Sequence, residues 1–144
     1  MADKNTDGYA GDITPREAWK MLQIEENVIL VDVRSAAEWT YVGVTDLSSL
    51  GAEAAAIEWK SFPHMEENKN FISQVKKICP NSNTIILSLC RSGQRSIASS
   101  QALTKSGYKQ CYNVLEGFEG DIDSTQHRGN SGGWKFCGLP WKQS

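Results

Sequence analysis

Two uninterrupted apolar runs dominate the hydrophobic pattern of the chain. They span residues 28–31 and 85–87, and the first continues to residue 33 with only Asp32 as a polar interruption. A run without polar alternation is typical of a strand buried on both faces, as in a parallel sheet. Residues 112–115 predict a third strand, and residues 55–59 are a weaker candidate.

Helical patterns separate these strands. Thr14 and Glu17 form a capping box around Pro15, which suits the first helical position. Further on, apolar residues recur at helical spacing until Pro80 stops the pattern. Helices are predicted from residue 14 onward and over 36–41, 68–79 and 96–105. Strands that alternate with helices predict an α/β fold around a parallel central sheet.

The length of 144 residues fits one domain. The polar, glycine-containing start predicts a flexible N-terminal arm over residues 1–12, followed by the domain proper over residues 13–120. Residues 121–144 are rich in glycine and polar side chains and predict an irregular C-terminal tail. We expect Trp134, Leu139 and Trp141 to dock this tail onto the domain.

Charge and composition narrow the class of protein. The formal net charge is -2, whereas a nucleic-acid-binding protein is expected to be basic, so we expect no nucleic-acid partner. No apolar stretch approaches the roughly 18 residues that a membrane helix needs, so we expect no membrane partner. The chain start lacks the pattern of a signal peptide, which favours a cytoplasmic protein.

The segment from Cys90 to Ser96 carries the strongest chemical signal. Cys90 follows a buried strand, Gly93 permits a tight turn, and a helix begins about Ser96. Backbone N–H groups of such a loop and the helix N-terminus favour an anion, and Arg91 and Arg95 add two cations. These features favour a thiolate, so Cys90 is the predicted nucleophile.

The spacing inside this loop bears on the type of reaction. Cys90 and Arg95 are separated by four residues, one fewer than in phosphatases that use a thiolate. The shorter loop makes a smaller cradle, which suits an anionic sulfur on the cysteine better than a tetrahedral phosphate. A small-loop phosphatase or arsenate reductase stays open as an alternative, as does a binding module without catalysis.

Three segments together resemble the rhodanese-like sulfurtransferase family. Residues 31–34 with 38–39 resemble its D-V-R…E-[FWY] segment, residues 90–96 its C-R-x-G-x-R-S loop, and residues 113–118 its V-x-x-L-x-G-G segment. The resemblance implies a three-layer α/β fold with a five-stranded parallel central sheet and helices on both faces. It also implies a catalytic cysteine that cycles through a persulfide.

The residues of this loop receive specific roles in that interpretation. Arg91 and Arg95 are expected to hold an anionic sulfur donor such as thiosulfate. Backbone N–H groups of the loop, from Arg91 through Ser92, Gly93 and Gln94 to Ser96, are expected to stabilise the persulfide. Cyanide, a thiol or a protein thiol would accept the sulfur. No metal and no cofactor is predicted, since His64 and His127 have no ligands at metal spacing.

Two side chains outside the loop carry further predictions. Asp32 interrupts an apolar strand, and we expect it to support the site by accepting hydrogen bonds from the active loop. Arg34 is expected to pair with Glu38 at i, i+4 on the surface. Cys79, Cys111 and Cys137 are expected to be ordinary free thiols.

Overall fold

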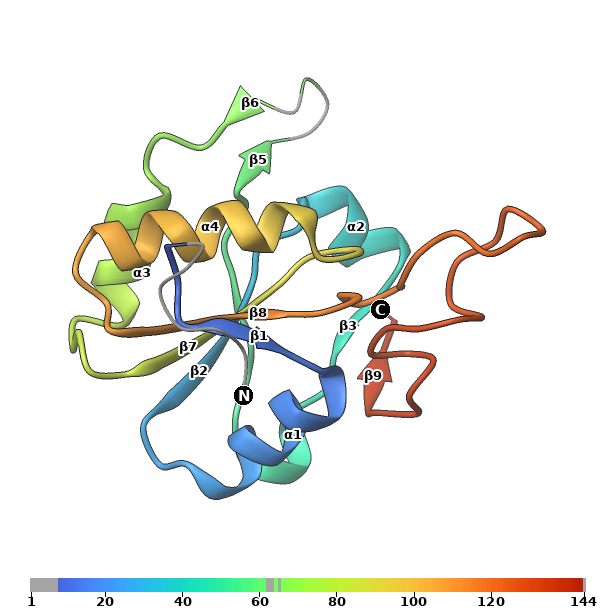
Figure 1. The fold of residues 1–144 in the computed structure, drawn as a ribbon, viewed down its shortest axis with the longest axis horizontal. Coiled ribbons are helices and arrows are strands. Elements are labelled where there is room, and N and C mark those ends of the chain that lie inside the picture. The colour runs from blue at the N-terminus through green and yellow to red at the C-terminus, as the bar shows by residue number, and fades with distance from the viewer. Residues whose placement is uncertain (1–7, 62–63, 65, 144) are drawn as a thin grey trace.

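A computed structural model describes residues 8–61, 64 and 66–143. Its centre is a five-stranded sheet with strand order β1-β8-β7-β2-β4, and each neighbouring pair runs parallel (Figure 1). The strands are β1 (Gly11–Ile13), β2 (Val28–Asp32), β4 (Ala55–Ala56), β7 (Ile85–Leu89) and β8 (Gln110–Val114). The predicted α/β fold with a five-stranded parallel sheet is therefore confirmed.

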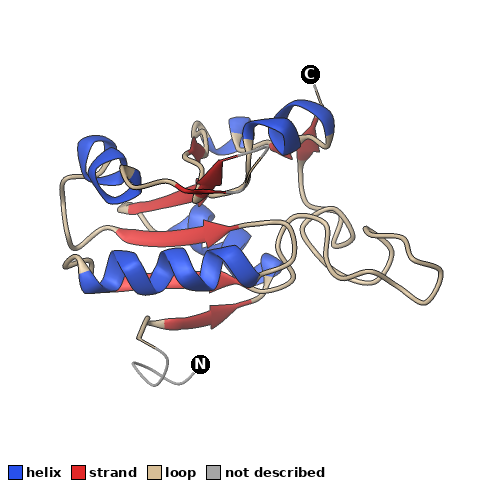
Figure 2. Cartoon of the chain, turned by 90° about the horizontal axis from the view of Figure 1, so that it is seen from above, coloured by secondary structure: helices blue, strands red, loops and turns tan. Residues whose placement is uncertain are grey.

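Helices cover both faces of this sheet, as the two orthogonal views show (Figures 1 and 2). One face carries α1, and the other carries α3 and α4, with α2 near the end of the sheet where the strands finish. The bounds are α1 (Pro15–Ile24), α2 (Ala36–Tyr41), α3 (Phe71–Ile78) and α4 (Gln94–Lys105). A short 3-10 helix, η1, spans Ser48–Leu50. Within the described residues, no helix is long and apolar enough to cross a membrane.

Each face of the sheet has its own hydrophobic core. Leu30, Leu87 and Leu89 point toward the α1 side, where Trp134 joins them. Val31, Ile86 and Cys90 point toward α3 and α4. The side chains of β2 and β7 alternate between the two cores because successive residues of a strand face opposite sides. Burial on both faces explains why these strands are continuous apolar runs in the sequence.

The N-terminal boundary differs from the predicted arm over residues 1–12. Gly11–Ile13 forms β1 at one edge of the sheet, and the Ala10 N–H donates to the carbonyl of Cys111 at 2.9 Å. Tyr9 is buried as well. Residues 9–12 thus belong to the fold, while residues 1–7 of the predicted arm lie outside the described residues. The strand is too short to show any periodicity in the sequence.

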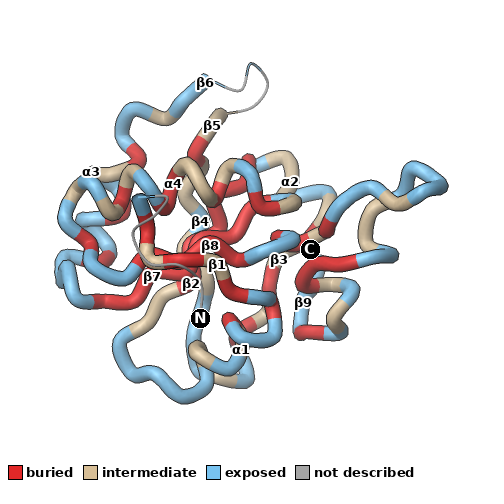
Figure 3. The backbone as a smooth tube through the Cα atoms, in the orientation of Figure 1, coloured by how far each residue is buried: buried red, intermediate tan, exposed pale blue. Residues whose placement is uncertain are grey.

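The C-terminal segment packs on the domain although it is mostly irregular. Trp134 is fully buried, meets Trp19 edge to face, and donates its indole N–H to the carbonyl of Pro140 at 2.7 Å. β9 (Trp141–Lys142) pairs antiparallel with β3 (Val44–Thr45). Figure 3 shows the exposed stretch of this C-terminal segment extending from the body of the molecule.

Elsewhere in the chain, β5 (Lys60–Ser61) pairs antiparallel with β6 (Glu66–Glu67).

Candidate active site

Cys90 lies directly after β7, at the carboxyl end of the central strand. In open parallel sheets this end is where ligands bind. The side chain is almost completely buried. Its Sγ accepts the Gly93 N–H at 3.0 Å and lies 3.2 Å from the Ser96 hydroxyl oxygen. The sulfur therefore has two polar contacts on the inner side of the loop.

The loop can close around Cys90 because of Gly93. This residue has φ 107°, a conformation that L side chains rarely adopt, and it is the N-cap of α4. The helix begins at Gln94, two residues earlier than the sequence predicts. The first turn of α4 therefore lies closer to the sulfur, and the positive end of the helix dipole favours negative charge there.

The segment that follows β8 contacts the same loop through backbone hydrogen bonds. The Phe118 N–H donates to the Cys90 carbonyl at 2.8 Å, and the Glu119 N–H donates to the Arg91 carbonyl at 3.0 Å. A Cβ atom at Gly117 would lie 2.3 Å from the Cys90 carbonyl oxygen, so only glycine fits this approach. The predicted resemblance of residues 113–118 thus corresponds to a direct contact with the active loop.

The mouth of the site is a pocket of about 410 Å³ between α2 and the loop. Its lining consists of Ser35, Ala37, Glu38, Tyr41, Val42, Arg91 and Arg95. Arg95 donates to both carboxylate oxygens of Glu38, at 2.7 and 2.9 Å. Arg91 is exposed, and its guanidinium makes no ion pair or hydrogen bond with any described residue. The two arginines of the loop therefore differ, one held in place and one available to a ligand.

Burial and pairing act in opposite directions on the Glu38–Arg95 pair. Burial by itself would raise the pKa of Glu38, but the hydrogen bond and charge of Arg95, together with hydrogen bonds from Ser35, lower it. Burial would also lower the pKa of Arg95, and the bond to Glu38 raises it instead. The pair is charged at neutral pH and ties α4 to α2.

The structure contradicts both predictions for Asp32 and Arg34. Arg34 is completely buried and forms a bidentate pair with Asp32, at 2.9 and 2.7 Å, rather than a surface pair with Glu38. Asp32 also accepts the Arg34 backbone N–H at 3.1 Å, so it caps its own turn instead of bonding the active loop. The i, i+4 prediction fails because Arg34 precedes α2, which begins at Ala36.

The structure gives Ser92 and Gln94 of the loop no hydrogen bond to the Cys90 sulfur. Ser92 is half-buried and Gln94 is exposed at the start of α4. Among the backbone N–H groups of the described loop, that of Gly93 is the one that reaches the sulfur. The sequence predicted no site role for Glu38, which binds Arg95, or for Asn113, which accepts the Ser96 hydroxyl, although both lie inside the segments that carry the family resemblance. The i, i+4 spacing predicted a pair between Glu38 and Arg34, whereas Glu38 pairs with Arg95.

The other three cysteines lie in different surroundings. Cys79 and Cys111 are buried in the core beneath α3 and α4, and Cys137 is half-buried. Burial raises the pKa of Cys111 to about 11, and a hydrogen bond from Thr104 offsets this only in part. The thiol of Cys111 is therefore unreactive at neutral pH.

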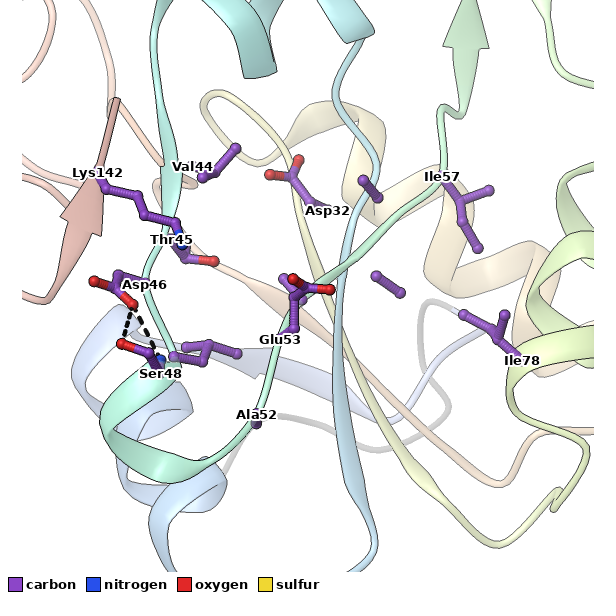
Figure 4. Close-up of a pocket in the computed structure, with 14 residues that line it drawn as sticks. Asp32, Val44, Thr45, Asp46, Ser48, Ala52, Glu53, Ile57, Ile78 and Lys142 are labelled. Atoms are coloured by element: carbon purple, nitrogen blue, oxygen red, sulfur yellow. Dashed lines mark hydrogen bonds between the residues drawn. The ribbon is translucent and has the colours of Figure 1, made fainter. Parts of the chain in front are cut away.

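A second pocket, of about 480 Å³, lies beside β3 and β4 (Figure 4). Asp46, Glu53 and Lys142 stand around it, and Asp46 accepts hydrogen bonds from Ser48. Its described lining contains no residue of the active loop, although Asp32 contributes one wall. The pocket between α2 and the loop, not this one, is lined by Arg91 and Arg95 of the loop.

Comparisons with known proteins agree with this architecture. A family model described as the STR4 middle domain matches residues 10–144. The crystal structure of Rv0390 from M. tuberculosis is 46% identical, with a TM-score of 0.86, and the match covers 94% of this chain and 99% of that one. The uncharacterized protein RC0915 of Rickettsia conorii is 37% identical over 132 residues, 91% of this chain and 96% of its own.

A more distant relative has a named activity. The thiosulfate sulfurtransferase GlpE of Actinobacillus succinogenes is 29% identical over 129 residues, which cover 90% of this chain and 87% of its own. The resemblance inferred from three sequence segments is thus confirmed by the fold and by relatives along most of the chain. The chain belongs to the STR4 middle domain family of rhodanese-like proteins.

Proposed function

We propose that this protein is a sulfurtransferase that carries sulfane sulfur on Cys90 as a persulfide. The observation that supports this most is the setting of the sulfur. Cys90 Sγ accepts the Gly93 N–H at 3.0 Å next to the first turn of α4, and the neighbouring Arg91 lines a pocket beside the loop. A cysteine at a helix N-terminus beside cations is set up as a nucleophile.

The proposed reaction has two half-reactions. The Cys90 thiolate attacks the outer sulfur of thiosulfate, the sulfur–sulfur bond of the donor breaks, and sulfite leaves with the bonding electron pair. Cys90 then carries an Sγ–S⁻ persulfide. Cyanide or a thiolate attacks the outer sulfur, the Sγ–S bond breaks, and the Cys90 thiolate returns as thiocyanate or an acceptor persulfide leaves.

Arg91 is the residue that we assign to the anionic donor. Its guanidinium is exposed at the pocket and has no partner among the described residues, whereas Arg95 is occupied by Glu38. This revises the expectation that both arginines bind the donor. Arg95 acts through the position of α4, and Arg91 supplies the free charge.

Intact mass spectrometry after incubation with thiosulfate tests the proposal. One added sulfur atom, mapped to Cys90 and removed by cyanide, is the expected result. Cys90→Ser should lose the added sulfur and all turnover, because a serine hydroxyl is not ionised at neutral pH. Cys137→Ser, which removes a half-buried thiol elsewhere, is the matched control and should keep full activity. Sulfur on another cysteine, or an active Cys90→Ser variant, would disprove the assignment.

An aryl phosphate assay separates the phosphatase alternative. The loop is one residue shorter than a phosphatase loop, and its Arg95 is held by Glu38 instead of pointing free into the pocket. We expect no phosphate release under conditions where thiosulfate loads Cys90. A binding module without catalysis would show neither loading nor phosphate release.

A further inference from the structure

A continuous chain of hydrogen bonds, buried at its inner end, runs from β1 at the edge of the sheet to the sulfur of Cys90. Tyr9 donates its hydroxyl to Asp12 Oδ1 at 2.7 Å, and Asn113 Nδ2 donates to the same oxygen at 3.0 Å. Asn113 Oδ1 in turn accepts the hydroxyl of Ser96, whose oxygen lies 3.2 Å from Cys90 Sγ. Asn113 and Ser96 are both completely buried.

The direction of each bond in this chain is fixed by its neighbour. A carboxylate can only accept, so Asp12 requires the amide N–H₂ of Asn113 to face it. The amide oxygen of Asn113 then faces Ser96. A serine hydroxyl has one proton, and Ser96 gives that proton to Asn113. The side of Ser96 Oγ that faces Cys90 is left as an acceptor.

We infer that Asn113 is a positioning residue for sulfur transfer, which turns the Ser96 hydroxyl away from Cys90 so that Ser96 accepts the thiol proton. This inference rests on the proposed function for its catalytic meaning, but the hydrogen-bond direction stands independently. Ser96 then stabilises the thiol form of Cys90, while the Gly93 N–H stabilises the thiolate. The two contacts therefore favour opposite protonation states of the sulfur.

The arrangement suits a sulfur carrier for a chemical reason. Once a persulfide has formed, the negative charge resides on the outer sulfur, and Sγ has neither a proton nor a full charge. A donor aimed at Sγ would stabilise the thiolate more than the persulfide. Nucleophilicity also falls as a thiolate becomes more stabilised. By withholding the Ser96 proton, Asn113 keeps the thiolate reactive and favours loading of sulfur.

Several charged groups lie on the elements around Cys90. These are Asp12, Asp32, Arg34, Glu38, Arg91, Arg95 and Glu116. The variant Asn113→Leu changes none of these charges and keeps a side chain of similar size. It removes the acceptor that orients Ser96, together with the amide donor to Asp12.

The decisive measurement is the rate of Cys90 alkylation by iodoacetamide as a function of pH, with the modified peptide identified by mass spectrometry. In Asn113→Leu the Ser96 hydroxyl is free to donate to the sulfur, so the midpoint of the profile should move down by about one pH unit. Below the midpoint this corresponds to about tenfold more thiolate. In a Ser96→Ala background the same substitution should have no further effect, because Asn113 acts through Ser96.

Asp12→Ala gives a second test that does not alter Asn113 itself. Without the carboxylate, the Asn113 amide can reverse and donate to Ser96. The midpoint should therefore move down more in the wild-type background than in a Ser96→Ala background, where only the lost charge acts. Tyr9→Phe removes the other bond to Asp12 and is the matched control, with an unchanged midpoint expected. If Asn113→Leu does not fold, Asp12→Ala and Ser96→Ala carry the test.

An unchanged or raised midpoint in folded Asn113→Leu or Asp12→Ala, or an additive effect with Ser96→Ala, would overturn the inference. Because alkylation requires no sulfur donor, this result is separate from the proposed function. A protein that shows the shift but never loads sulfur would disprove the sulfurtransferase proposal alone. Loading without the shift would disprove only the role of Asn113.

Discussion

Two arginine–carboxylate pairs lie at the candidate site, one in its buried base and one near its surface. At its base, Arg34 and Asp32 are both buried, and the Arg34 guanidinium lies 4.3 Å from the centre of the Phe118 ring. At its mouth, the Arg95 and Glu38 side chains keep 16% and 17% of their surface exposed. The pairs have the same chemistry and nearly the same bond lengths, so burial is what distinguishes them.

The difference determines what each pair does. Arg34 also donates to the Gly43 carbonyl at 2.7 Å, and its contact with Phe118 reaches the residue that holds the Cys90 carbonyl. The Arg34–Asp32 pair, here called the inner pair, is therefore part of the core beneath the loop. The Arg95–Glu38 pair, here called the outer pair, joins α4 to α2 near the surface, where water can replace either partner. A buried charge that loses its partner is much more costly than an exposed one.

Breaking the inner pair should have the largest effect on stability. Arg34→Met leaves the Asp32 carboxylate buried without its cation, and we expect a loss of about 3–5 kcal/mol in the free energy of unfolding. Urea denaturation of the variant and the wild type measures it. The double variant Asp32→Leu/Arg34→Met should regain much of the loss, because no unpaired charge remains. A single variant within 1 kcal/mol of wild type would contradict the buried role.

Removing the unpaired arginine should affect the donor more than the fold. Arg91→Ala loses one charge-assisted contact, worth about 1.5–3 kcal/mol, which corresponds to a rise of about 10- to 150-fold in the KM for thiosulfate. Steady-state kinetics would show it, with the melting temperature unchanged. Arg91→Lys should keep part of the affinity. An equal loss with an uncharged sulfane donor would show that Arg91 does not act through charge.

Breaking the outer pair should have the smallest effect, and that effect should depend on pH. Glu38→Gln should cost less than about 1 kcal/mol of stability, since the pair is partly solvated. The pKa of Glu38 is lowered in the folded protein, so the carboxylate stabilises the fold at pH above its usual value of 4.5 and loses this contribution as pH falls through the lowered pKa.

Melting temperatures recorded from pH 7 to pH 3 would test this prediction. The difference between wild type and Glu38→Gln should be present at neutral pH and should shrink in acid. Glu67→Gln, which changes an exposed glutamate of β6, is the matched control and should show no such difference. A difference that grows as pH falls would contradict the assigned sign.

The candidate site was predictable as far as it depends on contiguous residues. Cys90, Gly93 and Ser96 lie within seven positions, and the change from apolar strand to glycine turn to helix brings them together locally. Arg95 belongs to the same segment, but its partner Glu38 is 57 positions away. No local pattern identifies a partner at that distance, and the nearer Arg34 was the wrong choice for Glu38.

The sequence by itself predicted strands near β2, β7 and β8, their alternation with helices, the parallel sheet and the loop that carries Cys90, because apolar runs, caps and a glycine turn act over short distances. Only the tertiary structure decided which carboxylate each arginine meets, that residues 9–12 join the sheet, and that Asn113 connects Asp12 to Ser96. These contacts depend on β1, β2, β7 and β8 lying next to one another. Such side-chain pairing is settled by packing and burial, since distant polar groups must find partners once water is excluded.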